Sequence, residues 1–278
     1  MKPDDAPITR RVALGIAYDG SGFHGFAAQP NQRTVAGEIS RALGSLFGDD
    51  AKIVCAGRTD AGVHALAQVA HVDLDFDVLC TRFGLDPIAP GAEIPDLARS
   101  LDALVGPEIV IWRVLVAPDG FDARRSATSR RYRYEVRTGS RPDPLKRWTS
   151  WHVAELLDVS AMRIGVDALL GEHDFAGFCR RPPNDEGGPI VRRVIEARLD
   201  HHQPDMVAFE IEANAFCHQM VRSIVGTLVA AGRGSRRPSE VMRLLAAGNR
   251  DGAADPAPPG GLCLVAVRYP DSLTGTWS

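Results

Sequence analysis

Residues 52–74, KIVCAGRTDAGVHALAQVAHVDL, contain two apolar segments on either side of a motif with two glycines. The segments KIVCAG and LAQVAHVDL are short, apolar and bounded by turn residues, which predicts two strands. The motif between them, AGRTDAGVHA, is predicted to be a loop because glycines interrupt strands. Asp60 is therefore expected in a loop between two strands, two residues after Arg58 and four residues before His64.

The same patterns predict the other elements of the chain. Strands are expected over 11–20, 108–116, 131–138, 191–199, 207–212 and 262–269, and helices over 34–47, 97–104, 160–170, 215–231 and 238–247. Strands and helices mix in both halves without the regular alternation of a parallel doubly wound sheet. The sequence therefore predicts an α+β protein.

Composition places the chain among ordinary globular proteins. Its 278 residues are 45% hydrophobic and 24% charged, which suffices for one large domain or two modest ones. No apolar run reaches the ~18 residues of a membrane span, and the acidic N-terminus is unlike a signal peptide. The five cysteines are odd in number and lack metal-type spacing, which favours free thiols in the cytoplasm.

Basic charge is concentrated although the net charge is −3. FDARRSATSRRYRY, residues 121–134, holds five arginines, and Tyr132 and Tyr134 lie two positions apart, so that both rings of a strand point to one face. Tyrosine in a strand often serves ordinary packing. Arginines with tyrosines are also typical of surfaces that neutralise phosphates and stack bases. The residues alone leave both interpretations open.

Asp60 is the carboxylate with the most suggestive surroundings. An Asp beside glycines often only forms a turn, although loops on rigid scaffolds are also where catalytic groups concentrate. Arg58 shares its face if the chain is extended there, and a carboxylate beside a guanidinium stays ionised, as a nucleophile or electrostatic stabiliser requires. His64 lacks a second metal ligand and Cys55 lies in an apolar strand, so structural roles are expected for both.

The predicted helix over 215–231, AFCHQMVRSIVGTLVAA, is apolar nearly all round and should be buried. Arg222 interrupts this surface. A guanidinium buried there would need an acidic partner, since an unpaired buried charge costs about 3–5 kcal/mol. Asp60 is a candidate partner. Alternatively, Arg222 extends to solvent along its aliphatic stem.

Several segments together resemble the tRNA pseudouridine synthases of the TruA type. They occur in that family's order from residue 14 to residue 270: YDGSGFHGF, AGRTDAGVHA, FDARRSATSRRYRY, GEHDF, ANAFCHQMVRSIVG and GLCLVAVRYP. The resemblance implies that Asp60 is the catalytic aspartate and Tyr132 the tyrosine that packs against the target uracil. It further implies that Arg222 ion-pairs with the aspartate, that Leu264 lies beneath the base and that Arg58 helps to extrude the nucleotide.

The family's fold and activity follow as expectations. The resemblance implies two related RNP-like halves in one extended, mainly antiparallel sheet, with helices on one side and a basic cleft between the halves. The expected divisions are a flexible segment 1–10, halves over 11–140 and 141–270, and a tail 271–278. The implied activity isomerises uridines 38, 39 and 40 of tRNA, in a homodimer that needs neither a metal nor an organic cofactor.

Two other functions fit parts of the sequence. A noncatalytic tRNA-binding protein or RNA chaperone would use the same basic cleft. A small-molecule hydrolase with Asp60 as nucleophile would lack both a phosphate-binding motif and a second catalytic acid.

The chain departs from the family at a few positions that concern tRNA placement rather than the chemistry. Gly25-Phe26-Ala27 replaces the usual GWQ, Ala36 replaces a common glutamine, and Asp102 replaces an asparagine. The segment 78–100 is also longer and richer in proline than is typical.

Overall fold

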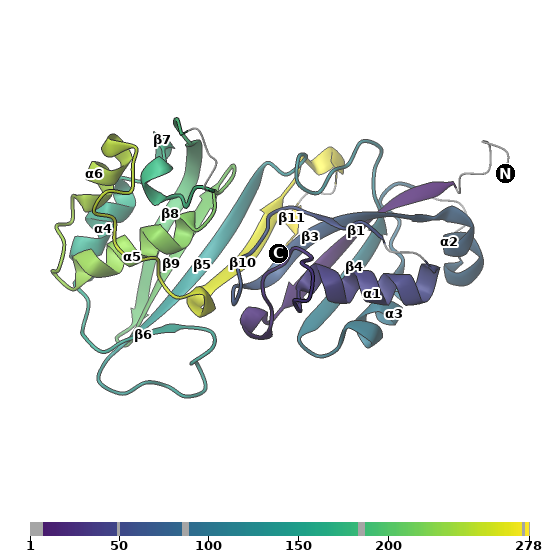
Figure 1. Cartoon of the computed structure of the whole chain (residues 1–278), viewed down its shortest axis with the longest axis horizontal. Helices are drawn as coiled ribbons and strands as arrows, with labels where there is room; N and C mark the ends of the chain where they lie inside the picture. The colour runs from purple at the N-terminus through teal and green to yellow at the C-terminus, as the bar shows by residue number, and fades with distance from the viewer. Residues whose placement is uncertain (1–7, 49–50, 85–88, 183–186, 274–275, 278) are drawn as a thin grey trace. The chain divides into compact units, whose positions relative to one another are not determined.

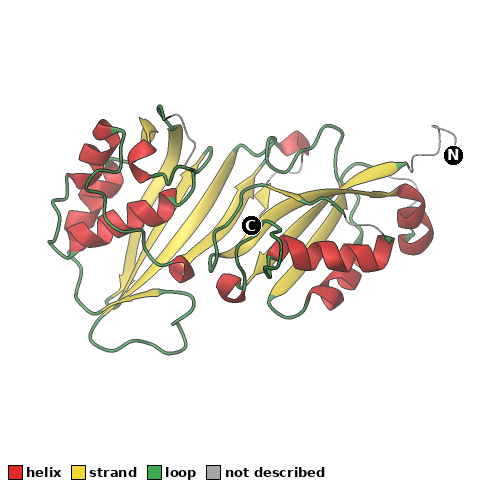
Figure 2. Cartoon of the chain, in the orientation of Figure 1, coloured by secondary structure: helices red, strands yellow, loops and turns green. Residues whose placement is uncertain are grey.

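The computed structural model describes residues 8–48, 51–84, 89–182, 187–273 and 276–277 and forms two compact units (Figure 1). The first unit comprises Met1–Thr128 and Val265–Ser278, and the second comprises Ser129–Leu264. β10 (Leu262–Arg268) contributes residues to both units. Each unit mixes strands and helices (Figure 2), which confirms the predicted α+β class.

The first unit is built on three long antiparallel strands in the order β4-β1-β3. Its strands are β1 (Thr9–Tyr18), β2 (Val54–Cys55), β3 (His64–Asp75), β4 (Ile109–Val116) and β11 (Thr276–Trp277). Its helices are α1 (Val35–Phe47), α2 (Phe76–Phe83) and α3 (Pro95–Val105), with the short 3-10 turns η1 (Gly20–Gly22) and η4 (Asp271–Leu273). β2 pairs with β3, and β11 pairs with β10.

The core of this unit surrounds β1, of which residues 12–16 are all buried. Gly15 is required there because a Cβ atom would lie 2.7 Å from the Trp112 indole and 2.9 Å from that of Trp277. α1 begins as the sequence predicts: the hydroxyl of Thr34 accepts the Gly37 N–H at 3.2 Å. α2 was not anticipated, although Asp75 caps it through the Val78 N–H.

The second unit has the strand order β5-β9-β8-β7, with β6 parallel to β5. Its strands are β5 (Ser129–Thr138), β6 (Trp151–Val153), β7 (Gly171–Asp174), β8 (Val191–Gln203) and β9 (Met206–Ala213). Its helices are α4 (Val159–Asp167), α5 (Met220–Gly232) and α6 (Glu240–Ala247), with the 3-10 turns η2 (Ala176–Phe178) and η3 (Pro259–Gly261). Among the described strands of this unit, all other pairs are antiparallel.

The boundaries of the two units differ from those expected at residues 140 and 270. β5 is paired with β9 from Arg130 to Arg137, so it groups with the second unit. The end of the chain groups with the first unit, where Val267 pairs with Trp277. The expected flexible segment 1–10 lies largely outside the described residues, and β1 already begins at Thr9.

The helix expected over 215–231 begins later, at Met220, so that prediction is wrong for its first turn. Gln219 has a left-handed backbone conformation, with a φ of 63°. A right-handed helix cannot run through such a residue, so the helix starts after it. The segment before it is tied elsewhere, because the Arg180 N–H donates to the His218 carbonyl at 2.9 Å. The helix that remains is almost entirely buried, as its apolar sequence predicts.

The expectation that all five cysteines are free is also wrong. Cys179 and Cys217 form a disulfide with their Cα atoms 5.7 Å apart, whereas Cys55, Cys80 and Cys263 are free. The two partners are 38 residues apart in sequence and carry no motif, so their pairing depends on the tertiary fold. Across the described ranges, no helix has the length and apolar character needed to cross a bilayer.

Candidate active site

Asp60 lies in the loop that joins β2 to β3, as the sequence predicts. β2 and β3 close the base of the loop, where the Ala56 N–H donates to the Val69 carbonyl at 2.8 Å. The loop ends in a tight turn, in which the Val63 N–H donates to the Asp60 carbonyl at 3.1 Å and Gly62 has a φ of 78°. The carboxylate is therefore carried by a short, hydrogen-bonded connection.

A second loop, residues 19–26, packs against this one through its backbone. The Phe26 N–H donates to the Thr59 carbonyl at 3.1 Å, next to the carboxylate-bearing residue. Two positions admit no side chain: a Cβ on Gly20 would lie 2.0 Å from the Val63 carbonyl oxygen, and one on Gly25 would lie 2.9 Å from that of Thr59. Glycine is thus required for the two loops to meet.

A buried polar network supports the Asp60 loop from beneath. The hydroxyls of Tyr18 and Thr59 are 2.8 Å apart, and the Gln68 amide donates to the Gly57 carbonyl at 2.7 Å. The sequence analysis missed these three side chains. Gln68 and Thr59 lie within the segment that it singled out, and a polar residue in an otherwise apolar strand is the signal that could have identified Gln68.

Arg58 and Asp60 flank Thr59, which is buried. Arg58 is exposed and Asp60 is partly buried. Cys55 lies just before them, and burial raises the pKa of its thiol to about 11 despite the opposing charge of Arg58. A buried thiol with a raised pKa stays protonated at neutral pH, which agrees with the structural role expected for Cys55.

His64 has the structural role that the sequence favoured. Its Nδ1 accepts the Gly20 N–H at 3.0 Å and lies 3.1 Å from a carboxylate oxygen of Asp19. Burial acts to raise the pKa of Asp19, but hydrogen bonds from Ser21 together with His64 bring it below its ordinary value. This histidine therefore joins the two loops at their base.

In the second unit, Tyr132 and Tyr134 lie on one face of β5, as their spacing predicts. The Tyr132 ring meets Phe216 edge-on, with centroids 5.0 Å apart. Tyr134 is fully buried, its hydroxyl donates to the Pro258 carbonyl at 2.7 Å, and burial strongly raises its pKa. Ordinary packing is thus the role of Tyr134, whereas Tyr132 lies beside an aromatic residue that the sequence analysis had assigned to a helix.

Arg131 and Arg133 of the basic stretch lie on the face of β5 opposite the two tyrosines, and both form ion pairs with glutamates of the second unit. Arg131 forms ion pairs of 2.7 Å with Glu212 and 2.6 Å with Glu196, and Arg133 pairs with Glu210 at 3.1 Å. These residues alternate with the tyrosines along β5 and so lie on its opposite face. The five arginines therefore do not form a single phosphate-binding surface.

Arg222 lies near Tyr134 within the second unit. The Nε of Arg222 donates to the Ala257 carbonyl at 2.8 Å, and the charge of Arg222 acts on the Tyr134 hydroxyl by opposing the rise in its pKa. α5 meets the segment before η3 closely, since a Cβ on Gly226 would lie 2.1 Å from the Asp255 carbonyl oxygen. Leu264 is fully buried in β10.

The predicted site residues are thus divided between the units: Asp60 and Arg58 in the first, and Tyr132, Arg222 and Leu264 in the second. The expected ion pair between Asp60 and Arg222 stays a prediction. Among the described residues, no three His, Cys, Asp or Glu side chains gather where a metal ion could bind.

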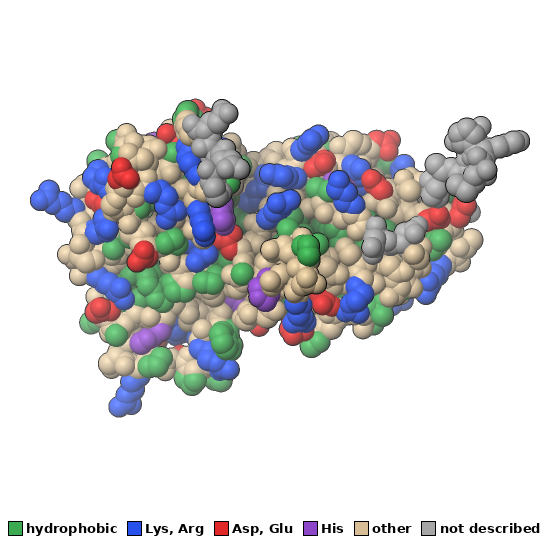
Figure 3. All heavy atoms as spheres, in the orientation of Figure 1, with side chains coloured by type: hydrophobic (Ala, Val, Ile, Leu, Met, Phe, Trp, Pro, Cys, Tyr) green, Lys and Arg blue, Asp and Glu red, His purple; other side chains and the backbone are tan. Residues whose placement is uncertain are grey.

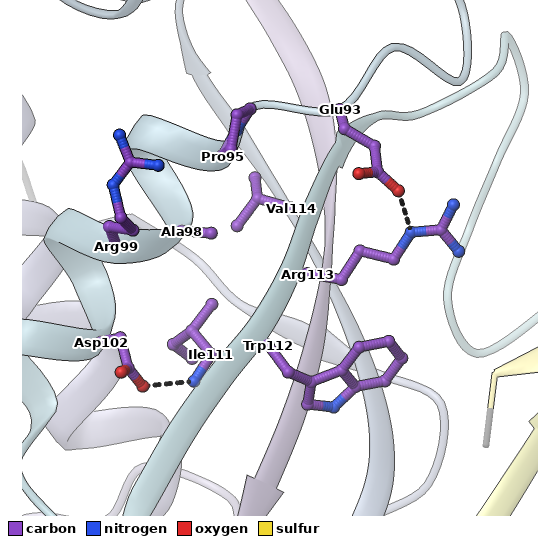
Figure 4. Close-up of a pocket in the computed structure, with 9 residues that line it drawn as sticks. All are labelled: Glu93, Pro95, Ala98, Arg99, Asp102, Ile111, Trp112, Arg113 and Val114. Carbon is purple, nitrogen blue, oxygen red and sulfur yellow. Dashed lines mark hydrogen bonds and ion pairs between the residues drawn. The ribbon is translucent and has the colours of Figure 1, made fainter.

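A hollow elsewhere in the first unit involves none of these residues. It lies between α3 and β4 (Figure 4), where Glu93 pairs with Arg113 at 2.8 Å. Asp102, one of the departures from the family, accepts the Ile111 N–H there at 3.0 Å, a bond that the usual asparagine could also accept. The departures Phe26 and Ala36 are buried, and the Ala36 N–H donates to the Phe26 carbonyl at 2.8 Å, so both belong to the core.

Comparisons with known proteins show the family of the chain. A family model described as tRNA pseudouridine synthase matches residues 166–270. The tRNA pseudouridine synthase A of Frankia casuarinae is 42% identical over 262 residues, covering 94% of this chain and 89% of the relative. Those of Leifsonia xyli and Streptomyces avermitilis are each 40% identical, over 94% and 97% of this chain and 92% of each relative. The chain therefore belongs to the tRNA pseudouridine synthase A family, whose members are isomerases.

Solved structures add little. The crystal structure of a Cbf5-Nop10-Gar1 complex matches 78% of this chain and 45% of its own with 14% identity and a TM-score of 0.34, too low to support any argument.

Proposed function

We propose that the protein converts uridine to pseudouridine at positions 38, 39 and 40 of the tRNA anticodon stem-loop, with Asp60 as the catalytic carboxylate. The observation that carries this proposal is the way two loops meet through Gly20 and Gly25 to fix the backbone around Asp60. A catalytic group has to be held to within a fraction of an ångström, because a displacement of about 1 Å costs about 100-fold in rate. An Asp that only formed a turn would need no such support.

The reaction needs one carboxylate and no redox partner. The bond from N1 of uracil to C1′ of ribose breaks, the base rotates, and a bond from C5 to C1′ forms; C5 loses its proton and N1 gains one. An ionised Asp60 would act at the ribose or at the pyrimidine ring. The proposed pair with Arg222 would keep the carboxylate charged and oriented.

The target base has to leave its stack first, which costs a few kcal/mol. Arg58 is exposed in the same loop as Asp60 and is assigned the extrusion of the nucleotide. Tyr132, with its edge-on partner Phe216 at 5.0 Å, would then cover one face of the uracil. Leu264 would lie beneath the base. In this proposal a basic cleft holds the tRNA, and a cytoplasmic homodimer is the acting form.

Replacing Asp60 with Asn tests the proposal. With tRNA tritiated at C5 of uridine, isomerisation releases tritium, and we expect D60N to lose about 100-fold or more of this release while it still binds tRNA. The matched control is Asp119→Asn. That carboxylate is 89% exposed and, like the proposed catalytic one, has an arginine neighbour, Arg10 at 3.5 Å. Undiminished release by D60N would refute the role of Asp60. Wild-type protein that binds tRNA with steep salt dependence and releases nothing would instead establish the noncatalytic alternative.

A further inference from the structure

The connection between β5 and β6, residues 139–150, is a basic and aromatic loop that the proposed function has not used. It extends away from the second unit's sheet (Figure 1) and carries hydrophobic and cationic side chains together on its surface (Figure 3). Leu145 is 88% exposed and Trp148 is 57% exposed. We call residues 139–150 the β5–β6 loop.

The cations of this loop carry no ion pairs among the described residues, although Arg147 also donates to the Pro144 carbonyl at 2.8 Å. Arg141, Lys146 and Arg147 are exposed, and none of them has an ion-pair partner within the described part of the chain. Arg131 and Arg133, in contrast, are engaged by glutamates. The three loop charges are therefore available to an external anion.

The loop is held in one conformation by its own backbone. The Lys146 N–H donates to the Asp143 carbonyl at 3.1 Å, and the Ser150 N–H donates to the Lys146 carbonyl at 3.0 Å. At its base, the Gly139 N–H donates to the Val153 carbonyl at 3.1 Å, and β6 runs parallel to β5. Little conformational freedom would thus be lost when this surface binds a ligand.

The indole and a guanidinium form one composite surface. The guanidinium of Arg147 lies over the Trp148 ring, 5.1 Å from its centroid. An exposed aromatic ring with an adjacent cation suits an unstacked base and its phosphate, because stacking works with any base and the cation neutralises the backbone.

The loop is also placed beside the candidate active site within the second unit. A Cβ on Gly260 would lie 2.8 Å from the Trp148 carbonyl oxygen, so the loop packs against η3. η3 continues directly into β10, which carries Leu264, and the residue before η3 accepts the hydroxyl of Tyr134. A nucleic acid bound to this loop would lie alongside the residues assigned to the target base.

We propose that the β5–β6 loop binds the tRNA substrate, with Trp148 stacking on an unpaired base and Arg141, Lys146 and Arg147 contacting phosphates. The identity of the RNA rests on the proposed function. Three positive charges against the single carboxylate of Asp143 favour a polyanion over a second copy of the chain as the occupant.

Equilibrium binding of unmodified tRNA between about 50 and 200 mM salt tests this proposal. The triple variant R141Q/K146Q/R147Q should reduce the slope of log Kd against log salt by about 2–3. Trp148→Ala should weaken binding about 5- to 100-fold at every salt concentration, and Trp148→Phe should restore most of the affinity, because a smaller ring still stacks. The matched control R163Q/R237Q removes two exposed cations elsewhere in the unit and should change the slope less.

The outcomes separate this proposal from the proposed function. Tritium release by the wild-type protein reports on the reaction independently of the loop. If the wild-type releases no tritium but the loop variants still lose tRNA affinity, the isomerase assignment fails and the loop proposal stands. Unchanged affinity and slope in the triple variant and in Trp148→Ala would overturn the loop proposal. Loss of self-association in these variants, measured by sedimentation, would also overturn it, because the loop would then contact a second copy.

Discussion

Replacing Gly20 with Ala introduces one methyl group at the point where the two loops around Asp60 meet. Its Cβ would lie 2.0 Å from the Val63 carbonyl oxygen, whereas ordinary contact begins at 3.4 Å. The obstacle is backbone, so the loops have to separate by about 1.4 Å. A displacement of that size at a catalytic residue costs about 100-fold in rate, equivalent to about 2.7 kcal/mol of transition-state stabilisation.

The same overpacking should lower the free energy of unfolding by about 1–3 kcal/mol. Tritium release from C5-labelled tRNA and urea denaturation measure the two effects on one preparation. Gly22→Ala is the matched control, because it lies in the same turn, is exposed, and its Cβ would meet only the flexible end of Arg33 at 3.1 Å. If G20A keeps its rate to within about threefold of G22A, the loops do not fix Asp60 and the reasoning fails.

Two further results are expected. Titration should find three thiols in the denatured, unreduced protein and five in the reduced protein. Reduction should lower the free energy of unfolding by up to about 4 kcal/mol, because the disulfide closes a 38-residue loop. Five thiols without reductant would contradict the Cys179–Cys217 pair. Hydrogen bonds from Arg11 lower the pKa of Asp73, so its stabilisation is present above the unfolded pKa of about 3.9 and lost as pH falls through the lower folded value. Because both partners are partly exposed, Asp73→Asn should cost less than about 1 kcal/mol at pH 7 in urea melts and less still at pH 3, and an equal cost at both pH values would count against this pair.

Local patterns predicted the parts of the site that depend on the neighbouring chain. The loop position of Asp60 follows from two short apolar segments with glycines between them. The common face of Tyr132 and Tyr134 follows from the two-residue period of a strand. Both were confirmed because nothing distant had to be known.

What the sequence could not predict depends on partners far along the chain. Phe216 looked helical because its apolar spacing continues that of α5, but its neighbour Cys217 is bonded to Cys179 and the helix starts later. The sequence indicated that Arg131 could bind phosphates, but the pairing of β5 with β9 places Glu212 beside it. Strand register and disulfide pairing depend on contacts between distant residues, and local sequence patterns do not predict such contacts.

Residues near the carboxyl end of the chain complete the core of the first unit, so they limit when that unit can fold during translation. Trp277 fills the space over Gly15, and Tyr269 donates its hydroxyl to the Ala123 carbonyl at 2.7 Å. The amino-terminal strands of this unit therefore cannot finish their core until the whole intervening unit has been synthesised. We expect the nascent amino-terminal strands to need protection from misassociation during that interval, which makes them the natural clients of a cotranslational chaperone.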